Sequence, residues 1–127
     1  MDSENQVGDA TASAGYRTVQ NPTEGANPAL TRERMMAEGL DPDKDPDLLL
    51  ENRIWDTYTP EADKASSIRN GIQSKIDNKQ THRVVVDLRG TTQTEASVRA
   101  AIRANPLRGV KEVMFLTKNG LSRPFRP

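Results

Sequence analysis

The sequence predicts an α/β (α+β) fold in which helices flank a mixed central sheet. Ile68, Ile72 and Ile76 have the four-residue spacing of a helix with one buried side. The run 84–86 is short and β-branched, which is typical of a buried strand. Residues 94–104 indicate a capped helix between this strand and a later apolar strand, so the two strands can pair in parallel through a right-handed crossover.

The remaining elements follow from turn signals and short apolar runs. The expected order is a helix at 3–14, a strand at 16–20, a hairpin at 47–58, a helix at 65–79, a strand at 82–88, a helix at 95–104, a strand at 110–117 and a short edge strand at 121–125. Residues 23–46 are polar and acidic with several prolines, and we expect a long, partly ordered loop there, with one or two helical turns at 30–38. We expect one domain over residues 1–127, since a chain of this length can bury a single core.

The composition excludes several classes of protein. Only 34% of the residues are hydrophobic, so a large apolar ligand pocket is not expected. No run approaches the roughly 18–20 apolar residues that cross a bilayer, and no signal pattern begins the chain, so we expect no membrane insertion by this domain. The chain lacks cysteine, which excludes disulfides and thiolate metal sites. Any metal is therefore expected on oxygen ligands or on His82.

Charge is divided between the two halves of the chain, although the net charge is zero. Residues 1–63 hold 14 acidic and 5 basic side chains, whereas residues 64–127 hold 4 acidic and 13 basic ones. One explanation is that the two halves simply pair through surface salt bridges, which are common and weak. The alternative is a cluster of carboxylates beside a basic surface. A metal-assisted phosphodiesterase needs that arrangement, because carboxylates hold the cation while Lys and Arg hold the polyanion.

Two carboxylates are expected to meet in the hairpin. If Glu51 and Asn52 are its two turn residues, Asp47 lies directly opposite Asp56 on one face. Facing like charges destabilise a sheet unless a cation, a proton or a lysine compensates. Oxygen ligands of this kind suit Mg²⁺ or Mn²⁺, with Zn²⁺ as an alternative. A longer turn would change the register and leave Asp47 as an ordinary residue at the start of a strand.

Two lysines lie among the isoleucines of the following helix. At 100° per residue, Lys75 and Lys79 fall about 20° to either side of Ile68. Either they extend along the helix edge into solvent, or one ammonium reaches the carboxylate pair and stabilises charge on a phosphate, with Lys75 preferred over Lys79. Glu4, on the flank of the first helix's apolar side, is a candidate third carboxylate, although an acidic residue near a helix N-terminus needs no function.

Other polar and aromatic residues give weaker indications. His82 precedes the central strand without a plausible second proton-transfer group, so a histidine-driven mechanism is not expected. The arginines of the basic half are candidates for phosphate contact, although each alone is typical of a solvated surface. They are Arg83, Arg89, Arg99, Arg103 and Arg108. The five aromatic residues mostly occupy core-like strand positions, so no stacking platform for single-stranded nucleic acid is expected.

Four segments taken in order resemble the CdiA C-terminal tRNA nuclease domain of contact-dependent growth inhibition systems: SENQVGDATASAGYRTVQNP, DPDLLLENRIWDTYTP, IQSKIDNKQTHRVVVDL and NPLRGVKEVMFLTKNG. The likeness covers nearly the whole chain. It implies a restriction-endonuclease-like core of the PD-(D/E)xK kind that cleaves tRNA with a divalent cation. The implied site residues are the metal-binding carboxylates Glu4, Asp47 and Asp56, and a catalytic lysine at Lys75 or Lys79. Tyr58 stands where the plain D-x-K motif has lysine, so the ammonium would have to come from the neighbouring helix.

The same resemblance implies a setting for this activity. The chain would be a toxin domain at the C-terminal end of a larger secreted or cell-surface effector, acting in the cytoplasm of a target bacterium. A cognate immunity protein would neutralise it in the producing cell. A DNA endonuclease toxin on the same core and a non-catalytic protein-binding module are the alternatives.

Overall fold

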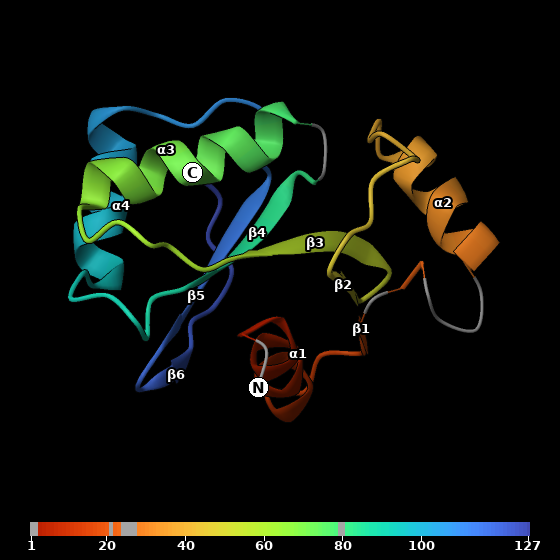
Figure 1. Cartoon of the computed structure of the whole chain (residues 1–127), viewed down its shortest axis with the longest axis horizontal. Helices are drawn as coiled ribbons and strands as arrows, with labels where there is room; N and C mark the ends of the chain where they lie inside the picture. The colour runs from red at the N-terminus through yellow and green to blue at the C-terminus, as the bar shows by residue number, and fades with distance from the viewer. Residues whose placement is uncertain (1–2, 21, 24–27, 79–80) are drawn as a thin grey trace.

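The computed structural model describes residues 3–20, 22–23, 28–78 and 81–127 (Figure 1). Its elements in chain order are α1 (Ser3–Ser13), β1 (Thr18–Gln20), α2 (Pro28–Ala37), β2 (Leu48–Leu50), β3 (Arg53–Tyr58), α3 (Ala65–Asp77), β4 (Arg83–Asp87), α4 (Glu95–Ala104), β5 (Glu112–Thr117) and β6 (Gly120–Leu121). None of the helices in these ranges combines the length and the apolar character that crossing a membrane requires.

The strands form one sheet in which spatial order follows chain order, from β1 to β6. The pairs β1–β2, β2–β3 and β5–β6 are antiparallel, whereas β3–β4 and β4–β5 are parallel. Helix α3 connects β3 to β4, and α4 connects β4 to β5, as parallel pairing requires. The prediction of a mixed sheet flanked by helices is therefore confirmed.

Helices cover both faces of the sheet (Figure 1). Helices α3 and α4 lie on one face and α1 on the other. On the first face, the isoleucines of α3 pack with Val84 and Val86, and on the second, Val85 packs with Val7 of α1. Because successive strand residues point to opposite faces, a valine at each position of 84–86 serves both cores, and all of β4 is buried.

The hairpin has the predicted register. Leu48 pairs with Trp55 and Leu50 with Arg53, which leaves Glu51 and Asn52 as the two turn residues. Both have positive φ, 48° and 63°, as a type I′ turn demands and as asparagine tolerates well. The alternative of a longer turn is wrong.

The segment 23–46 differs from the prediction of a long loop, because α2 has 10 residues rather than one or two turns. Met35 is completely buried and packs with Leu40 and with Ile54 of β3. The carboxylate of Glu38 accepts a hydrogen bond from the backbone N–H of Ile54 at 3.2 Å. The helix is therefore fixed by contacts with β3 that its own weakly apolar sequence does not reveal.

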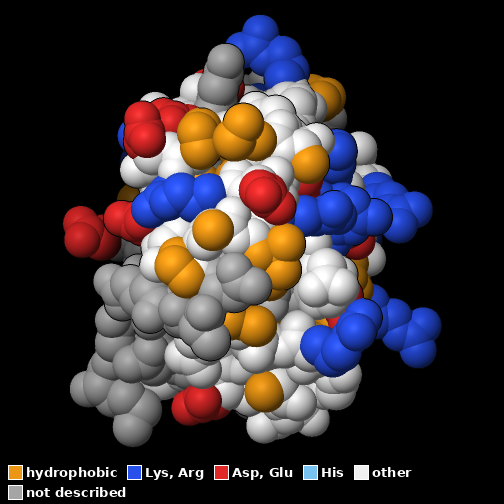
Figure 2. Space-filling model, turned by 90° about the vertical axis from the view of Figure 1, so that its right-hand side faces the viewer, with side chains coloured by type: hydrophobic (Ala, Val, Ile, Leu, Met, Phe, Trp, Pro, Cys, Tyr) orange, Lys and Arg blue, Asp and Glu red, His pale blue; other side chains and the backbone are white. Residues whose placement is uncertain are grey.

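The outer side of α2 stays open to solvent. Met36 is 64% exposed and Leu30 59% exposed. At this end of the molecule, hydrophobic side chains appear as separate patches among side chains of both charges (Figure 2). Only one side of α2 thus contributes to the core.

The last predicted strand, at 121–125, is also different. Strand β6 covers only Gly120 and Leu121, and the chain then returns to β5 through a single antiparallel bridge between Phe125 and Val113. Pro124 has no N–H to donate to a ladder. The C-terminal segment is therefore held beside β5 by Phe125.

Adjacent methionines test whether α2 belongs to the fold. Met35→Ala should lower the free energy of unfolding by about 2–5 kcal/mol, because it opens a cavity against Leu40 and Ile54. Met36→Ala, the matched control in solvent, should change it by less than about 0.5 kcal/mol. Urea unfolding followed by circular dichroism measures both. Equal effects of the two substitutions would contradict the packing of α2 on β3.

Candidate active site

The candidate site centres on Asp56, in the middle of β3 on the face that α3 covers. It pairs in register with Val84, and its side chain is only 2% exposed. The backbone N–H of Asp47 donates to Asp56 Oδ1 at 3.0 Å, and Lys75 Nζ lies 3.9 Å from Asp56 Oδ2. A buried carboxyl is thus in contact with groups from both the hairpin and α3.

Asp47 lies directly before β2, one register position beyond the Leu48–Trp55 pair and so opposite Asp56. Its Oδ2 accepts hydrogen bonds from the backbone N–H and from the hydroxyl of Thr57, both at 2.9 Å. The two carboxylates are therefore neighbours, as predicted. Sequence reasoning did not single out Thr57, whose position next to Asp56 in an otherwise apolar strand was the available signal.

The electrostatics of the pair are unfavourable to a second negative charge. Burial, and after it the negative charge of Asp47, raise the pKa of Asp56 from its ordinary 3.8 to about 8. Lys75 and the Asp47 N–H act in the opposite direction without offsetting burial. Without a cation, Asp56 therefore holds a proton at neutral pH.

Lys75 comes from α3, next to the buried Ile72 and Ile76. Its side chain remains 30% exposed, so the ammonium lies between the carboxyl of Asp56 and solvent. The prediction that a lysine of this helix reaches the carboxylate pair is thus confirmed for Lys75.

Two predicted site residues are not placed relative to this group. Lys79 lies outside the described residues. Glu4 belongs to α1, but its side chain is outside the described part, and α1 packs on the sheet face opposite α3. The structure therefore brings together Asp47, Asp56 and Lys75.

The donor set suits a divalent metal ion, although within the described ranges no three Asp, Glu or His side chains are close enough to hold one. The buried carboxyl of Asp56 beside Asp47 gives two hard oxygen donors whose mutual repulsion a cation relieves. A cation would take the place of the proton on Asp56, because metal binding requires ionised ligands. The residues present thus fit a metal, with at least one ligand still to be supplied.

Residues 44–121 match the family model of the contact-dependent growth inhibition CdiA C-terminal domain. The chain belongs to this family. The matched range contains Asp47, Asp56 and Lys75, all three members of the described site.

Two further relatives were found. The tRNA nuclease CdiA-2 of Burkholderia pseudomallei (strain 1026b) is 29% identical over 117 residues, which are 92% of this chain and 3% of that protein. The chain thus spans only a small part of that curated relative. A solved CdiA-CT/CdiI toxin and immunity complex from Burkholderia pseudomallei is 25% identical, with a TM-score of 0.76, and the match covers 98% of this chain and 82% of that chain.

Close packing between α3 and β3 was not anticipated as part of the site. A Cβ atom on Gly71 would lie 2.0 Å from the Tyr58 hydroxyl oxygen, so any other residue there would force the Tyr58 side chain to move. Burial raises the pKa of Tyr58, and the nearby Glu61 adds to this. A glycine in the middle of a predicted helix was the available signal, since it indicates a close approach of another group.

His82 has a structural role in this family member. One ring nitrogen lies 3.1 Å from the carbonyl oxygen of Gly109 and the other 2.9 Å from that of Glu38. These contacts connect α2 to the loop before β5. Both ring nitrogens of His82 are thus in contact with backbone carbonyl oxygens.

Two of the arginines considered for phosphate contact already pair with carboxylates of the protein. Arg83 is buried and pairs with Glu38 at 2.8 Å and with Glu112 at 3.0 Å. Arg89 donates three hydrogen bonds to the buried carboxylate of Asp87, which raises the pKa of Arg89. Arg83 is therefore not available for phosphate contact, because its guanidinium already pairs with two carboxylates.

The raised pKa of Asp56 predicts how stability depends on pH without a metal. Between about pH 4 and pH 8 the folded protein keeps a proton that the unfolded chain has released, so the contribution of Asp56 to stability falls as the pH rises. Asp56→Asn should therefore raise the free energy of unfolding at pH 8 by about 1–3 kcal/mol. Near pH 4.5 the gain should largely disappear, because Asp56 is already neutral there.

Urea unfolding in EDTA at both pH values measures this difference. The exposed Asp43 provides a matched control, since Asp43→Asn should show no such pH dependence. A loss of stability of equal size at both pH values would contradict the protonated state of Asp56.

Proposed function

We propose that this chain is a toxin nuclease domain that hydrolyses tRNA phosphodiester bonds with a divalent metal ion. The observation that carries this proposal is the buried Asp56 carboxyl, which lies between Asp47 and the ammonium of Lys75. Membership of the CdiA C-terminal family and the likeness to a curated tRNA nuclease support the choice of substrate.

The carboxylates would hold the metal, with Asp47 and Asp56 as ligands and Glu4 as the proposed third. When bound, a divalent cation would supply a Lewis acid and lower the pKa of a bound water. Mg²⁺ or Mn²⁺ suits an all-oxygen site, and Zn²⁺ is the alternative. Thr57 donates two hydrogen bonds to Asp47 and so fixes the direction of its carboxylate.

Lys75 would stabilise negative charge on the phosphate. Its ammonium is 3.9 Å from Asp56 Oδ2 and 30% of the side chain is exposed, so a phosphate arriving from solvent meets it beside the carboxylates. A fixed positive group stabilises the charge that builds up in the transition state. Lys79, the second lysine of the prediction, is the alternative source of this charge.

The proposed setting is bacterial competition. The chain would act in the cytoplasm of a target bacterium after delivery as part of a larger effector, which agrees with the 3% share of the curated relative that it spans. A cognate immunity protein would neutralise it, as the solved toxin and immunity complex of a relative suggests. The clustered charges at the site give such a partner a complementary surface.

Cleavage of total tRNA tests the catalytic assignment. The chain should produce discrete fragments with Mg²⁺ or Mn²⁺ and none with EDTA. Asp47→Ala, Asp56→Ala and Lys75→Ala should each lower the rate by at least about 100-fold, because each removes a ligand or charge needed in the transition state. Gel analysis of the fragments over time gives the rates.

Two exposed residues of the same types serve as controls. Asp43→Ala and Lys118→Ala should cleave at the rate of the unchanged chain. Plasmid DNA runs in parallel lanes. Cleavage of DNA in place of tRNA would move the proposal to a DNA endonuclease, and cleavage of neither would favour a non-catalytic binding module.

Growth of cells that express the chain tests Glu4. Expression of the unchanged chain should arrest growth, and the combined substitutions Glu4→Ala, Asp47→Ala and Asp56→Ala should abolish this effect, since no carboxylate ligand would remain. Glu4→Ala alone should reduce cleavage without lowering the thermal stability of the purified protein. Persistent toxicity of the triple variant at equal expression would overturn the site assignment.

A further inference from the structure

A second concave site lies between α4 and the C-terminal segment. It encloses a volume of about 400 Å³. We call this site the α4 groove. Its lining includes Arg99, Ile102, Arg103, Pro106, Phe125 and Arg126. None of Asp47, Asp56 and Lys75 contributes to it. Phe125 is bridged to β5, so the groove lies at the β5 side of the sheet rather than at β3.

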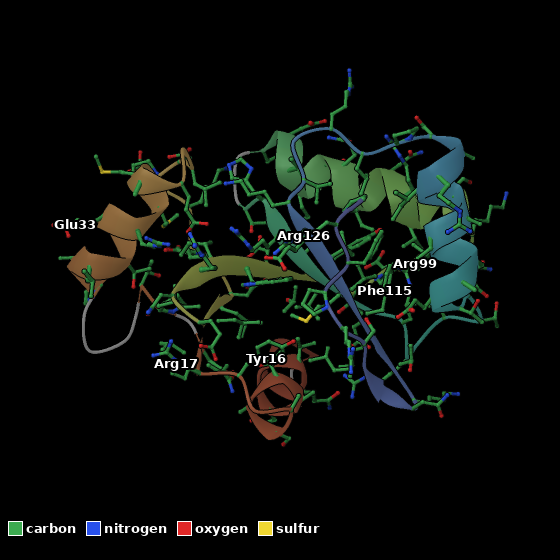
Figure 3. The ribbon with its side chains drawn as sticks, turned by 180° about the vertical axis from the view of Figure 1, so that it is seen from behind. Tyr16, Arg17, Glu33, Arg99, Phe115 and Arg126 are labelled. Atoms are coloured by element: carbon green, nitrogen blue, oxygen red, sulfur yellow. The ribbon has the colours of Figure 1, made fainter. Side chains whose placement is uncertain are left out.

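Arg99 lies over an aromatic ring in this groove. Its guanidinium carbon lies 4.4 Å from the ring centroid of Phe125, and the Phe125 ring stacks with that of Phe115 at 5.8 Å and 15°. Figure 3 shows Arg99 and Phe115 beside α4. Phe125 is fixed by two backbone hydrogen bonds to Val113, each 2.9 Å. One terminal nitrogen of Arg99 also donates to Glu95 at 3.4 Å, so the guanidinium offers chiefly its planar surface.

Two further guanidinium groups accompany Arg99. Arg103 follows one turn later on α4, and Arg126 follows Phe125. Both side chains are exposed, and neither has a carboxylate partner in the part of the chain that the structure describes. Residues 95–127 hold seven basic side chains and two acidic ones, Glu95 and Glu112, which already pair with Arg99 and Arg83. The groove therefore lies in a strongly positive region.

We propose that the α4 groove binds one nucleotide of the substrate RNA, away from the bond that is cut. The base would lie against Ile102, Pro106 and the plane of Arg99, and the phosphate would bind Arg103 and Arg126. Unstacked RNA bases commonly stack on guanidinium planes, and arginine binds phosphate through paired donors. The volume lies within the range of small-ligand sites. This inference rests on the proposed RNA substrate.

An RNA nucleotide fits these features better than an acidic protein segment. A carboxylate side chain uses only the charge of the arginines and leaves the apolar floor of Ile102 and Pro106 uncovered. A nucleotide has both an anionic group and a flat ring in one ligand. The combination of planar, apolar and cationic surfaces therefore favours RNA.

Binding of fluorescent tRNA and of a single-stranded RNA 20-mer tests the proposal. Anisotropy is measured with the full chain in EDTA, at several salt concentrations. Arg103→Ala with Arg126→Ala should weaken binding at least about tenfold and reduce the salt slope by about one to two, as expected for two lost phosphate contacts. Arg99→Lys keeps the charge but removes the planar surface, and should weaken binding about fivefold.

The matched control removes the same charge elsewhere. Lys118 and Arg123 lie in the same basic region but outside the groove lining. The double variant Lys118→Ala with Arg123→Ala should weaken RNA binding by less than about threefold. Circular dichroism confirms that each variant folds. Equal weakening by both double variants, or none by either, would overturn the groove as a site. Loss of immunity protein binding with unchanged RNA binding would overturn it in favour of a protein partner.

EDTA separates this inference from the proposed function, because binding is then measured without cleavage. A chain that binds RNA through the groove but never cuts it would keep the inference and overturn the nuclease. If the unchanged chain cuts tRNA and the groove variants cut it with the same KM, the nuclease assignment stands and the groove inference is overturned.

Discussion

The close approach of α3 to β3 fixes the geometry of the candidate site. Gly71 of α3 lies against the ring of Tyr58 in β3. Asp56 lies two residues before Tyr58 in the strand, and it contacts Lys75, which lies one turn after Gly71 in the helix. Two strand residues cover about 6.7 Å and four helix residues about 6 Å. Because α3 runs antiparallel to β3, these equal steps bring Asp56 and Lys75 together once Gly71 and Tyr58 are in contact.

The same packing creates an electrostatic conflict at Asp56. Enclosing the carboxyl under α3 removes it from water while Asp47 stands beside it, and the single ammonium at 3.9 Å does not offset both effects. A fold selected for stability alone would favour a neutral side chain at this position. The unfavourable charge is therefore an argument for function, since strongly shifted pKa values gather at functional sites.

Sequence patterns predicted those features of the site that depend on local geometry. The Glu51-Asn52 turn determined the hairpin register, and so the Asp47–Asp56 pair, while helical periodicity placed Lys75 on the inner side of α3. Features that depend on contacts between distant segments were missed. Helix α2 is fixed by Met35 against β3, and Thr57 takes its role only because the hairpin folds back on it.

The basic residues of the second half of the chain fall into two kinds in the fold: those that pair with carboxylates and those that stay exposed. Both Arg83 and Arg89 already pair with carboxylates of the protein. Arg83 is buried between Glu38, directly after α2, and Glu112 of β5, whereas the partly exposed Arg89 binds Asp87 of β4. Arg103 and Arg126 have no such partner among the described residues and stay at the surface. A count of charges cannot make this distinction, because it depends on which side chains the β4 and α4 positions turn inward. The exposed cations of the α4 groove are therefore available to a polyanion, while Lys75 contacts the carboxylate pair.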